Sequence, residues 1–236
     1  MSNIKDLFKQ LTLKTHEILF SKLLFNANVI DFSNITLSAL VATESLANNI
    51  AYTYFFTYNT SLLYFSSYLQ KKVLADKTLR EHMFFIKRNK LILKTKLVSN
   101  FLYSLKRFSL YLQLLMHFIA SIFARTTELS TLIYCNLITS SQRTLLFNKS
   151  ICLFMLRLQY TKNFYTTKQE AFVVKYLCAA ISYITTLYIV LVLSFKHFIE
   201  IKFFNRIVTY FALLFEHKNV AFNTQQLSLL IRSCSL

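Results

Sequence analysis

The chain contains no glycine, no proline and no tryptophan in 236 residues. At ordinary frequencies, a chain of this length would hold roughly 17 glycines and about 12 prolines. Glycine is the usual residue where the backbone takes a positive φ, and proline is the strongest helix stop. Asn-Gly β-hairpins are therefore excluded, and a sandwich or barrel that needs many such turns is disfavoured. The double absence predicts an all-α protein with long helices.

The lack of glycine also excludes several families of enzyme. The P-loop, the dinucleotide fingerprint, the Gly-x-Ser-x-Gly elbow and the EF-hand loop all need glycine for their backbone shape. The chain has no His-Glu-x-x-His motif, and His16, His82, His197 and His217 are flanked by charge, as surface histidines usually are. We therefore expect no enzymatic activity, no catalytic residue, no metal site and no cofactor.

The remaining histidine and the cysteines are the isolated residues that could carry chemistry. His117 lies inside an apolar segment, where it could bind haem or pair with a partner's carboxylate. A hydrogen-bonded structural histidine is the favoured interpretation. The cysteines are far apart and form no C-x-x-C pair, which favours free thiols in helices over a metal site or disulfides. They are Cys135, Cys152, Cys178 and Cys234.

The charge of the chain is strongly one-sided, with 27 Lys and Arg against 10 Asp and Glu, a formal net charge of +17. A charge of this size indicates contact with phosphate, in nucleic acid or in lipid headgroups. Yet 55% of the residues are apolar and the mean hydropathy is +0.42, which is unusually apolar for an RNA-binding protein. Charge and hydropathy thus point to different classes of protein.

Basic residues concentrate in Lys71–Arg107, which holds eleven of them against two acidic residues. Apolar residues recur there at three- and four-residue steps, the pattern of an amphipathic helix. That helix could be an ordinary solvated one, could lie on anionic headgroups, or could lie along RNA. The apolar stripe is Leu79, Met83, Ile86, Leu93, Leu97, Phe101 and Leu105. The residues expected to meet lipid headgroups or RNA phosphates are Lys71, Lys72, Lys87, Arg88, Lys90, Lys94, Lys96, Lys106 and Arg107.

Three uncharged segments are candidate membrane spans. Ser45–Gln70 is long enough but contains several Asn and Tyr residues. Phe108–Ala124 has 17 residues, the lower limit for a hydrocarbon core of about 30 Å. Tyr176–Phe195 is the best candidate, because its 20 residues are flanked by Lys175 and Lys196, which could snorkel to the headgroups. The sequence therefore predicts one to three transmembrane spans, with Tyr176–Phe195 crossing the membrane.

Capping boxes support the helical interpretation. Thr167 and Glu170 form a T-x-x-E box directly before the apolar run that ends in the best candidate span. Similar boxes occur at Thr78–Glu81 and Thr139–Gln142, each before an apolar-rich run. No linker, repeat or low-complexity segment separates parts of the chain, so we expect a single helical domain over residues 1–236.

The stretches "AYTYFFTYNTSLLYFSSYLQKK" and "KHFIEIKFFNRIVTYFALLF" show the compositional style of the whole chain. In this style, though in no motif, the chain resembles divergent, AT-biased proteins encoded in ciliate-type mitochondrial genomes. The resemblance implies partners in the respiratory-chain complexes, ATP synthase or the mitochondrial ribosome.

Two functions follow as expectations. The first is a non-catalytic accessory subunit of a respiratory-chain complex or ATP synthase, embedded in the mitochondrial inner membrane among other subunits and bound cardiolipin. The alternative is a mitochondrial ribosomal protein whose Lys- and Arg-rich helices neutralise rRNA phosphates. Hydropathy favours the first function and net charge favours the second.

Overall fold

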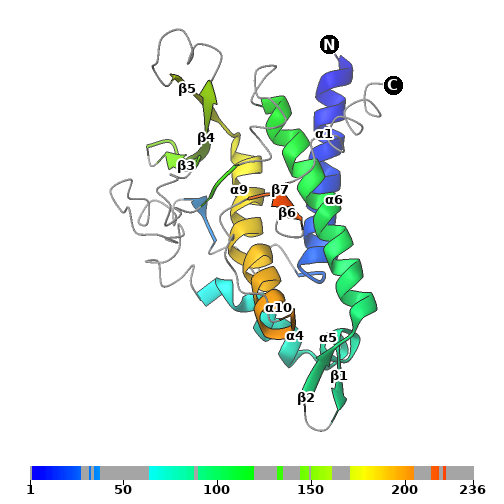
Figure 1. Cartoon of the computed structure of the whole chain (residues 1–236). Helices are drawn as coiled ribbons and strands as arrows, with labels where there is room; N and C mark the ends of the chain where they lie inside the picture. Colours follow the sequence, from blue (N-terminus) through cyan, green and yellow to red (C-terminus); the bar gives the residue numbers. More distant parts are fainter. Residues whose placement is uncertain are drawn as a thin grey trace.

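The computed structural model describes residues 2–27, 32, 35–37, 64–87, 90–119, 132–134, 144–148, 150–160, 171–204, 214–217 and 220–221. Three long helical segments lie side by side in this part of the chain (Figure 1). The middle segment in the sequence, α6, runs antiparallel to the other two (Figure 1). The first is α1 (Ser2–Glu17) with η1 (Ile18–Leu23), the second is α6 (Thr95–Ile119), and the third is α9 (Ala179–Leu187), η3 (Tyr188–Leu193) and α10 (Ser194–Phe204).

The first segment packs one apolar face on the core and leaves charged residues on the other. Leu11, Leu19 and Leu23 are buried, and the Thr15 hydroxyl donates a hydrogen bond to the carbonyl of Leu11 at 2.6 Å. The segment ends in a loop in which Phe25 and Asn26 both take positive φ values, 53° and 54°. Glycine is the usual residue in this backbone region at the end of a helix. Here phenylalanine and asparagine take its place.

The third segment is the most buried helix among the described residues. Its π-helical turn, η3, is buried at every position, and the hydroxyls of Thr185 and Thr186 bond back to helix carbonyls at 2.7 and 2.9 Å. Such back-bonding satisfies a polar group that has no access to water. The helix Ala179–Phe204 is long and apolar enough to cross a membrane, but 78% of its apolar window is buried within the protein.

This helix begins later than the capping box predicts. Residues 161–170, which include Thr167 and Glu170, lie outside the described residues, and β5 (Ala171–Tyr176) follows them as a strand. The helix starts at Ala179, after Cys178. The prediction of a helix through "AFVVKY" was wrong because this β-branched and aromatic stretch pairs with a neighbouring strand.

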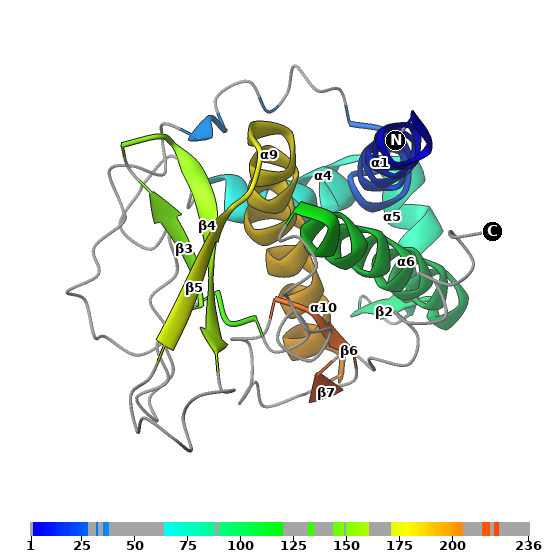
Figure 2. The same cartoon turned by 90° about the horizontal axis from the view of Figure 1, so that it is seen from above.

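Three small antiparallel sheets contradict the all-α prediction, although helices hold most of the regular structure that is described. Seen from above, the sheet β3–β4–β5 lies beside α9, on the side away from α1 (Figure 2). The turn between β3 and β4 forms without glycine. The side-chain oxygen of Asn148 accepts a hydrogen bond from Ser150 N at 2.9 Å, and Cys152 takes a positive φ of 53°. The strands are β1 (Phe84–Lys87) with β2 (Lys90–Leu93); β3 (Leu145–Asn148), β4 (Leu153–Tyr160) and β5; and β6 (Glu216–His217) with β7 (Val220–Ala221).

The basic segment Lys71–Arg107 is not one amphipathic helix. It contains most of α4 (Tyr68–Ala75), then α5 (Lys77–Met83), the β1–β2 hairpin, and the first half of α6. The α5 helix is capped by Asp76, whose Oδ1 accepts a bond from Leu79 N at 3.1 Å, and not by the predicted box at Thr78–Glu81. The hairpin forms because two strand-length apolar runs, "FFI" and "LIL", flank a polar connection.

The described core is one hydrophobic cluster that takes in all three long helical segments and the three-stranded sheet. Aromatic rings link the helices: Phe25, after η1, packs against Phe101 of α6 at 6.0 Å and against Phe195 of α10 at 5.8 Å. Cys152 and Cys178 are not in helices, contrary to expectation; they lie in the β3–β4 turn and before α9. Cys135, Cys234 and the box Thr139–Gln142 lie outside the described residues.

Candidate nucleic-acid interface

The predicted phosphate-contacting residues are divided among three elements, so the structure does not gather them on one helix. Lys71 on α4 is exposed and its Nζ lies 4.5 Å from the ring centre of Tyr64, while Lys72 is half-buried. Arg88 lies outside the described residues. Lys87 and Lys90 lie on the hairpin, Lys94 lies between the hairpin and α6, and α6 carries Lys96, Lys106 and Arg107.

The β1–β2 hairpin has a basic tip. Lys87 and Lys90 are cross-strand partners at the last register position before the connection, and the hairpin extends past the start of α6 (Figure 1). Behind the tip, Phe85 pairs with Ile92, and these side chains are 43% and 36% exposed, which leaves an apolar face beside the charges. Lys94 has a structural role instead, because its Nζ donates to the carbonyl of Glu81.

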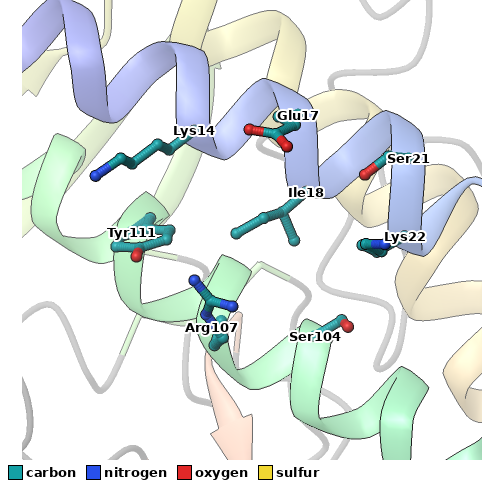
Figure 3. Close-up of a pocket in the computed structure, with 8 residues that line it drawn as sticks. All are labelled: Lys14, Glu17, Ile18, Ser21, Lys22, Ser104, Arg107 and Tyr111. Carbon is teal, nitrogen blue, oxygen red and sulfur yellow. The ribbon is translucent and has the colours of Figure 1, made fainter.

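A second basic site lies between α1–η1 and α6, where the two segments leave a cavity of about 250 Å³. Figure 3 shows Arg107 and Tyr111 on α6 facing α1, with Lys14 near one end of the cavity and Lys22 near the other. The lining contains three cations, one carboxylate and three hydroxyl groups; its residues are Lys14, Glu17, Ile18, Ser21, Lys22, Ser104, Arg107 and Tyr111. We call this cavity the α1–α6 pocket.

Arg107 is flanked by two tyrosines of its own helix, Tyr103 and Tyr111. A hydrogen bond with Tyr111 raises the pKa of its guanidinium, partly offset by burial, and the Tyr111, Tyr103 and Glu17 side chains add smaller electrostatic effects that also raise it. Its Cζ atom lies 6.0 Å from the ring centre of Tyr103. An arginine fixed in this way is always charged and presents several N–H donors in a planar fork.

The depth of Arg107 bears on the membrane prediction. The next residue, Phe108, packs against Tyr188 with ring centres 5.0 Å apart, and the Ser109 hydroxyl lies 3.3 Å from the Tyr188 hydroxyl. Tyr188 is near the middle of the apolar helix Ala179–Phe204. Exposed Arg107 and the charged α1–α6 pocket are therefore level with the middle of the candidate span.

The structure describes only part of each of the other two predicted spans. Residues 45–63 lie outside the described residues, and 64–70 fall in short helical pieces before and within α4. Phe108–Ile119 is the second half of α6, and residues 120–124 are not described. By length and composition, one helix among the described residues could cross a membrane, and a buried core helix of a soluble protein has the same properties.

A buried ion pair lies inside the apolar helix, and sequence reasoning missed it. Lys196 Nζ is 3.8 Å from a carboxylate oxygen of Glu200, and these side chains are only 5% and 8% exposed. The expectation that Lys196 snorkels to a surface was therefore wrong. His197, expected at the surface, is half-buried, and burial together with the charge of Lys196 lowers its pKa to about 3. The i, i+4 spacing of Lys196 and Glu200 was the available signal.

His117 is half-buried near the end of α6, with its ring centre 6.4 Å from that of Phe118, and its role as a haem ligand is not tested. No group of three or more His, Cys, Asp or Glu side chains among the described residues could hold a metal ion. The chain matches no protein-family model, and no curated protein and no solved structure is similar to it.

Proposed function

We propose that the chain is a non-catalytic structural protein of the mitochondrial ribosome that binds rRNA phosphates through its basic elements. The net charge of +17 supports phosphate as the partner chemistry. The basic tip of the β1–β2 hairpin adds a projecting element with an apolar face, a combination that suits phosphates and unpaired bases. The mitochondrial setting rests on the resemblance in compositional style.

One observation carries the choice of RNA over lipid: charged side chains on α1 and α6 lie level with the middle of the apolar helix. If Ala179–Phe204 crossed a bilayer, Arg107 would lie near the centre of the hydrocarbon. An arginine there costs about 3 kcal/mol on the insertion scale. Lys14, Glu17 and Lys22 line the same pocket as Arg107, so they would lie within about two helical turns of its depth. A core helix covered by protein and basic outer faces explains both the hydropathy and the charge.

The second candidate function is the accessory subunit of a respiratory-chain complex or ATP synthase in the mitochondrial inner membrane. The observation that favours it is the helix Ala179–Phe204, with 26 residues and a mean hydropathy of 1.7 in its most apolar window. In that function the basic hairpin would meet cardiolipin or the matrix parts of other subunits. The pocket of charges beside the helix would then need to be covered by those subunits.

A comparison of RNA and liposome binding separates the two functions. In the full chain, Lys87, Arg88 and Lys90 are replaced by Gln; Lys94 is kept because it bonds to the Glu81 carbonyl. If three rRNA phosphate contacts are lost, the salt dependence of log K should weaken by roughly 0.7–0.9 per contact. Binding to anionic liposomes should not change.

The matched control replaces three exposed lysines that belong to neither the hairpin nor the pocket: Lys5 and Lys9 on α1 and Lys77 on α5. Lys5→Gln and Lys9→Gln with Lys77→Gln remove the same charge from exposed helical positions. Equal loss of RNA affinity in both triple variants would mean that only net charge matters. Loss of liposome binding with RNA binding intact would favour the membrane function.

A further inference from the structure

We propose that the α1–α6 pocket binds a phosphate group and that Arg107 is its principal ligand. The proposal rests on the geometry of the pocket, which is independent of the hairpin. It relies on the proposed function only for the source of the phosphate, which we infer to be the RNA backbone.

The composition of the lining fits an anion. The lining has three cationic side chains, Lys14, Lys22 and Arg107, and one carboxylate, Glu17, which together give a formal charge of +2. Ser21, Ser104 and Tyr111 add hydroxyl groups that can donate to phosphate oxygens. Charge-assisted bonds of this kind are roughly twice as strong as neutral ones, and a guanidinium can bind phosphate through two parallel N–H groups.

The size of the pocket fits a small ligand group. Its volume of about 250 Å³ equals that of roughly eight water molecules at about 30 Å³ each. This is enough for a phosphate with part of its attached sugar and too little for a folded partner segment. A neighbouring cavity of about 300 Å³ shares Ser21, Lys22 and Ser104 with it and reaches Met83 at the end of α5, which leaves space for an RNA strand to continue from the bound phosphate.

Arg107 is suited to be the principal ligand because it is already oriented. Tyr111 contacts it from one turn further along α6 and Tyr103 lies under it from one turn earlier. Little side-chain entropy therefore remains to be lost when phosphate binds. Glu17, on α1, attracts the guanidinium but repels an incoming anion. Removing the charge of Glu17 should therefore strengthen anion binding.

The test is protection of Arg107 from phenylglyoxal, which modifies accessible guanidinium groups, measured by mass spectrometry on the full chain. Inorganic pyrophosphate at ten times its Kd should slow the modification of Arg107 about tenfold, because roughly one tenth of the sites stay empty. A single-stranded RNA oligonucleotide should protect it in the same way. Arg80, bonded to the Leu74 carbonyl, serves as the internal reference and should be unaffected.

Variants supply the second measurement. Arg107→Gln and Lys22→Gln should each reduce the salt dependence of RNA binding by roughly 0.7–0.9, whereas Lys9→Gln on the exposed face of α1 should not. Glu17→Gln should bind pyrophosphate roughly two- to tenfold more tightly, since it removes a repulsive charge. Arg107 is exposed, so these substitutions leave the core intact.

The outcomes separate the pocket from the proposed function. Protection by pyrophosphate and RNA, with the expected variant effects, supports both. Protection by pyrophosphate alone supports the phosphate site but removes RNA as its source. RNA binding that is unchanged in Arg107→Gln, with no protection, overturns the pocket and leaves the proposed function standing. Protection only by phosphatidylglycerol vesicles overturns the proposal in favour of a lipid headgroup contact.

Discussion

Two ion pairs with the same i, i+4 spacing have opposite environments in this chain. Lys196 and Glu200 are buried, whereas the side chains of Lys77 and Glu81 are 78% and 65% exposed with their charged atoms 4.0 Å apart. A buried charge is costly without its partner, while an exposed one returns to water. Sequence spacing alone does not distinguish the pairs, because burial depends on elements that are distant in the sequence.

We expect Glu200→Leu to lower the free energy of unfolding by about 3–5 kcal/mol, because it removes the carboxylate from a buried ammonium group. The double variant Lys196→Met with Glu200→Leu should recover much of that loss. Glu81→Leu is the matched control and should cost less than about 1 kcal/mol. Denaturant unfolding of the four chains gives these values, and equal losses in Glu200→Leu and Glu81→Leu would contradict a buried pair.

His197 should make stability depend on pH. Burial and then the nearby Lys196 charge lower its pKa from 6.5 to about 3, so the folded chain holds it neutral while the unfolded chain protonates it near pH 6.5. The contribution of neutral His197 to the free energy of unfolding is therefore fully present above pH 6.5 and is lost as the pH falls from there toward 3. One proton gives a slope of at most roughly 1.4 kcal/mol per pH unit.

His197→Phe should flatten this part of the pH dependence. Urea unfolding of both chains between pH 4 and 7.5 isolates the contribution, because the acidic residues are common to both. Parallel curves for the wild-type chain and His197→Phe would show that the histidine is protonated equally in the folded and unfolded states.

Whole elements were predictable where one periodicity dominated the sequence. The helix around Tyr188 and the amphipathic stretch after Lys94 follow from apolar runs and from three- and four-residue spacing. The β1–β2 hairpin was missed because Ile86 and Leu93 also fit a helical stripe, although a charged residue, Lys90, occupies the helical position between them. The absence of glycine suggested that hairpins would be rare, but asparagine and other residues can replace it at turns.

The candidate site was only half predictable for a related reason. Composition predicted Arg107 as a residue that meets lipid headgroups or RNA phosphates, since it lies in the most basic stretch of the chain. Lys14, Glu17 and Lys22 were not singled out, because they come from a segment with balanced charge. Only the packing of α1–η1 against α6 brings them to Arg107.

A cross-link distinguishes the hairpin from the predicted helix. With Phe85→Cys and Ile92→Cys, the two cysteines should form a disulfide on mild oxidation, since opposed residues of an antiparallel pair have Cα atoms about 4.5–5.5 Å apart. In a helix, residues seven apart are separated by about 10 Å, beyond the reach of a disulfide. Peptide mass spectrometry detects the link, and its absence with both thiols reactive would favour a helix.

At the scale of the whole molecule, most of the apolar helix Ala179–Phe204 is buried by other described parts of the chain. The segment Ala179–Phe204 contacts α6 through Tyr188 and is bordered by the three-stranded sheet at its start, where Ser182 Oγ accepts a bond from Phe154 N at 3.2 Å. Under the proposed function, this burial within the chain explains the hydropathy of the helix. The charged residues that a bilayer would reject are on the outer faces of α1 and α6.

Alkaline carbonate extraction of mitochondria tests this account most directly. The proposed function predicts that the chain is released into the supernatant, and that without carbonate it sediments with ribosomal subunits and is freed from them by high salt. An integral inner-membrane protein in the same sample serves as the control and should stay in the pellet. Retention of this chain in the membrane pellet, with none in the ribosomal fractions, would contradict the account and establish Ala179–Phe204 as a membrane span.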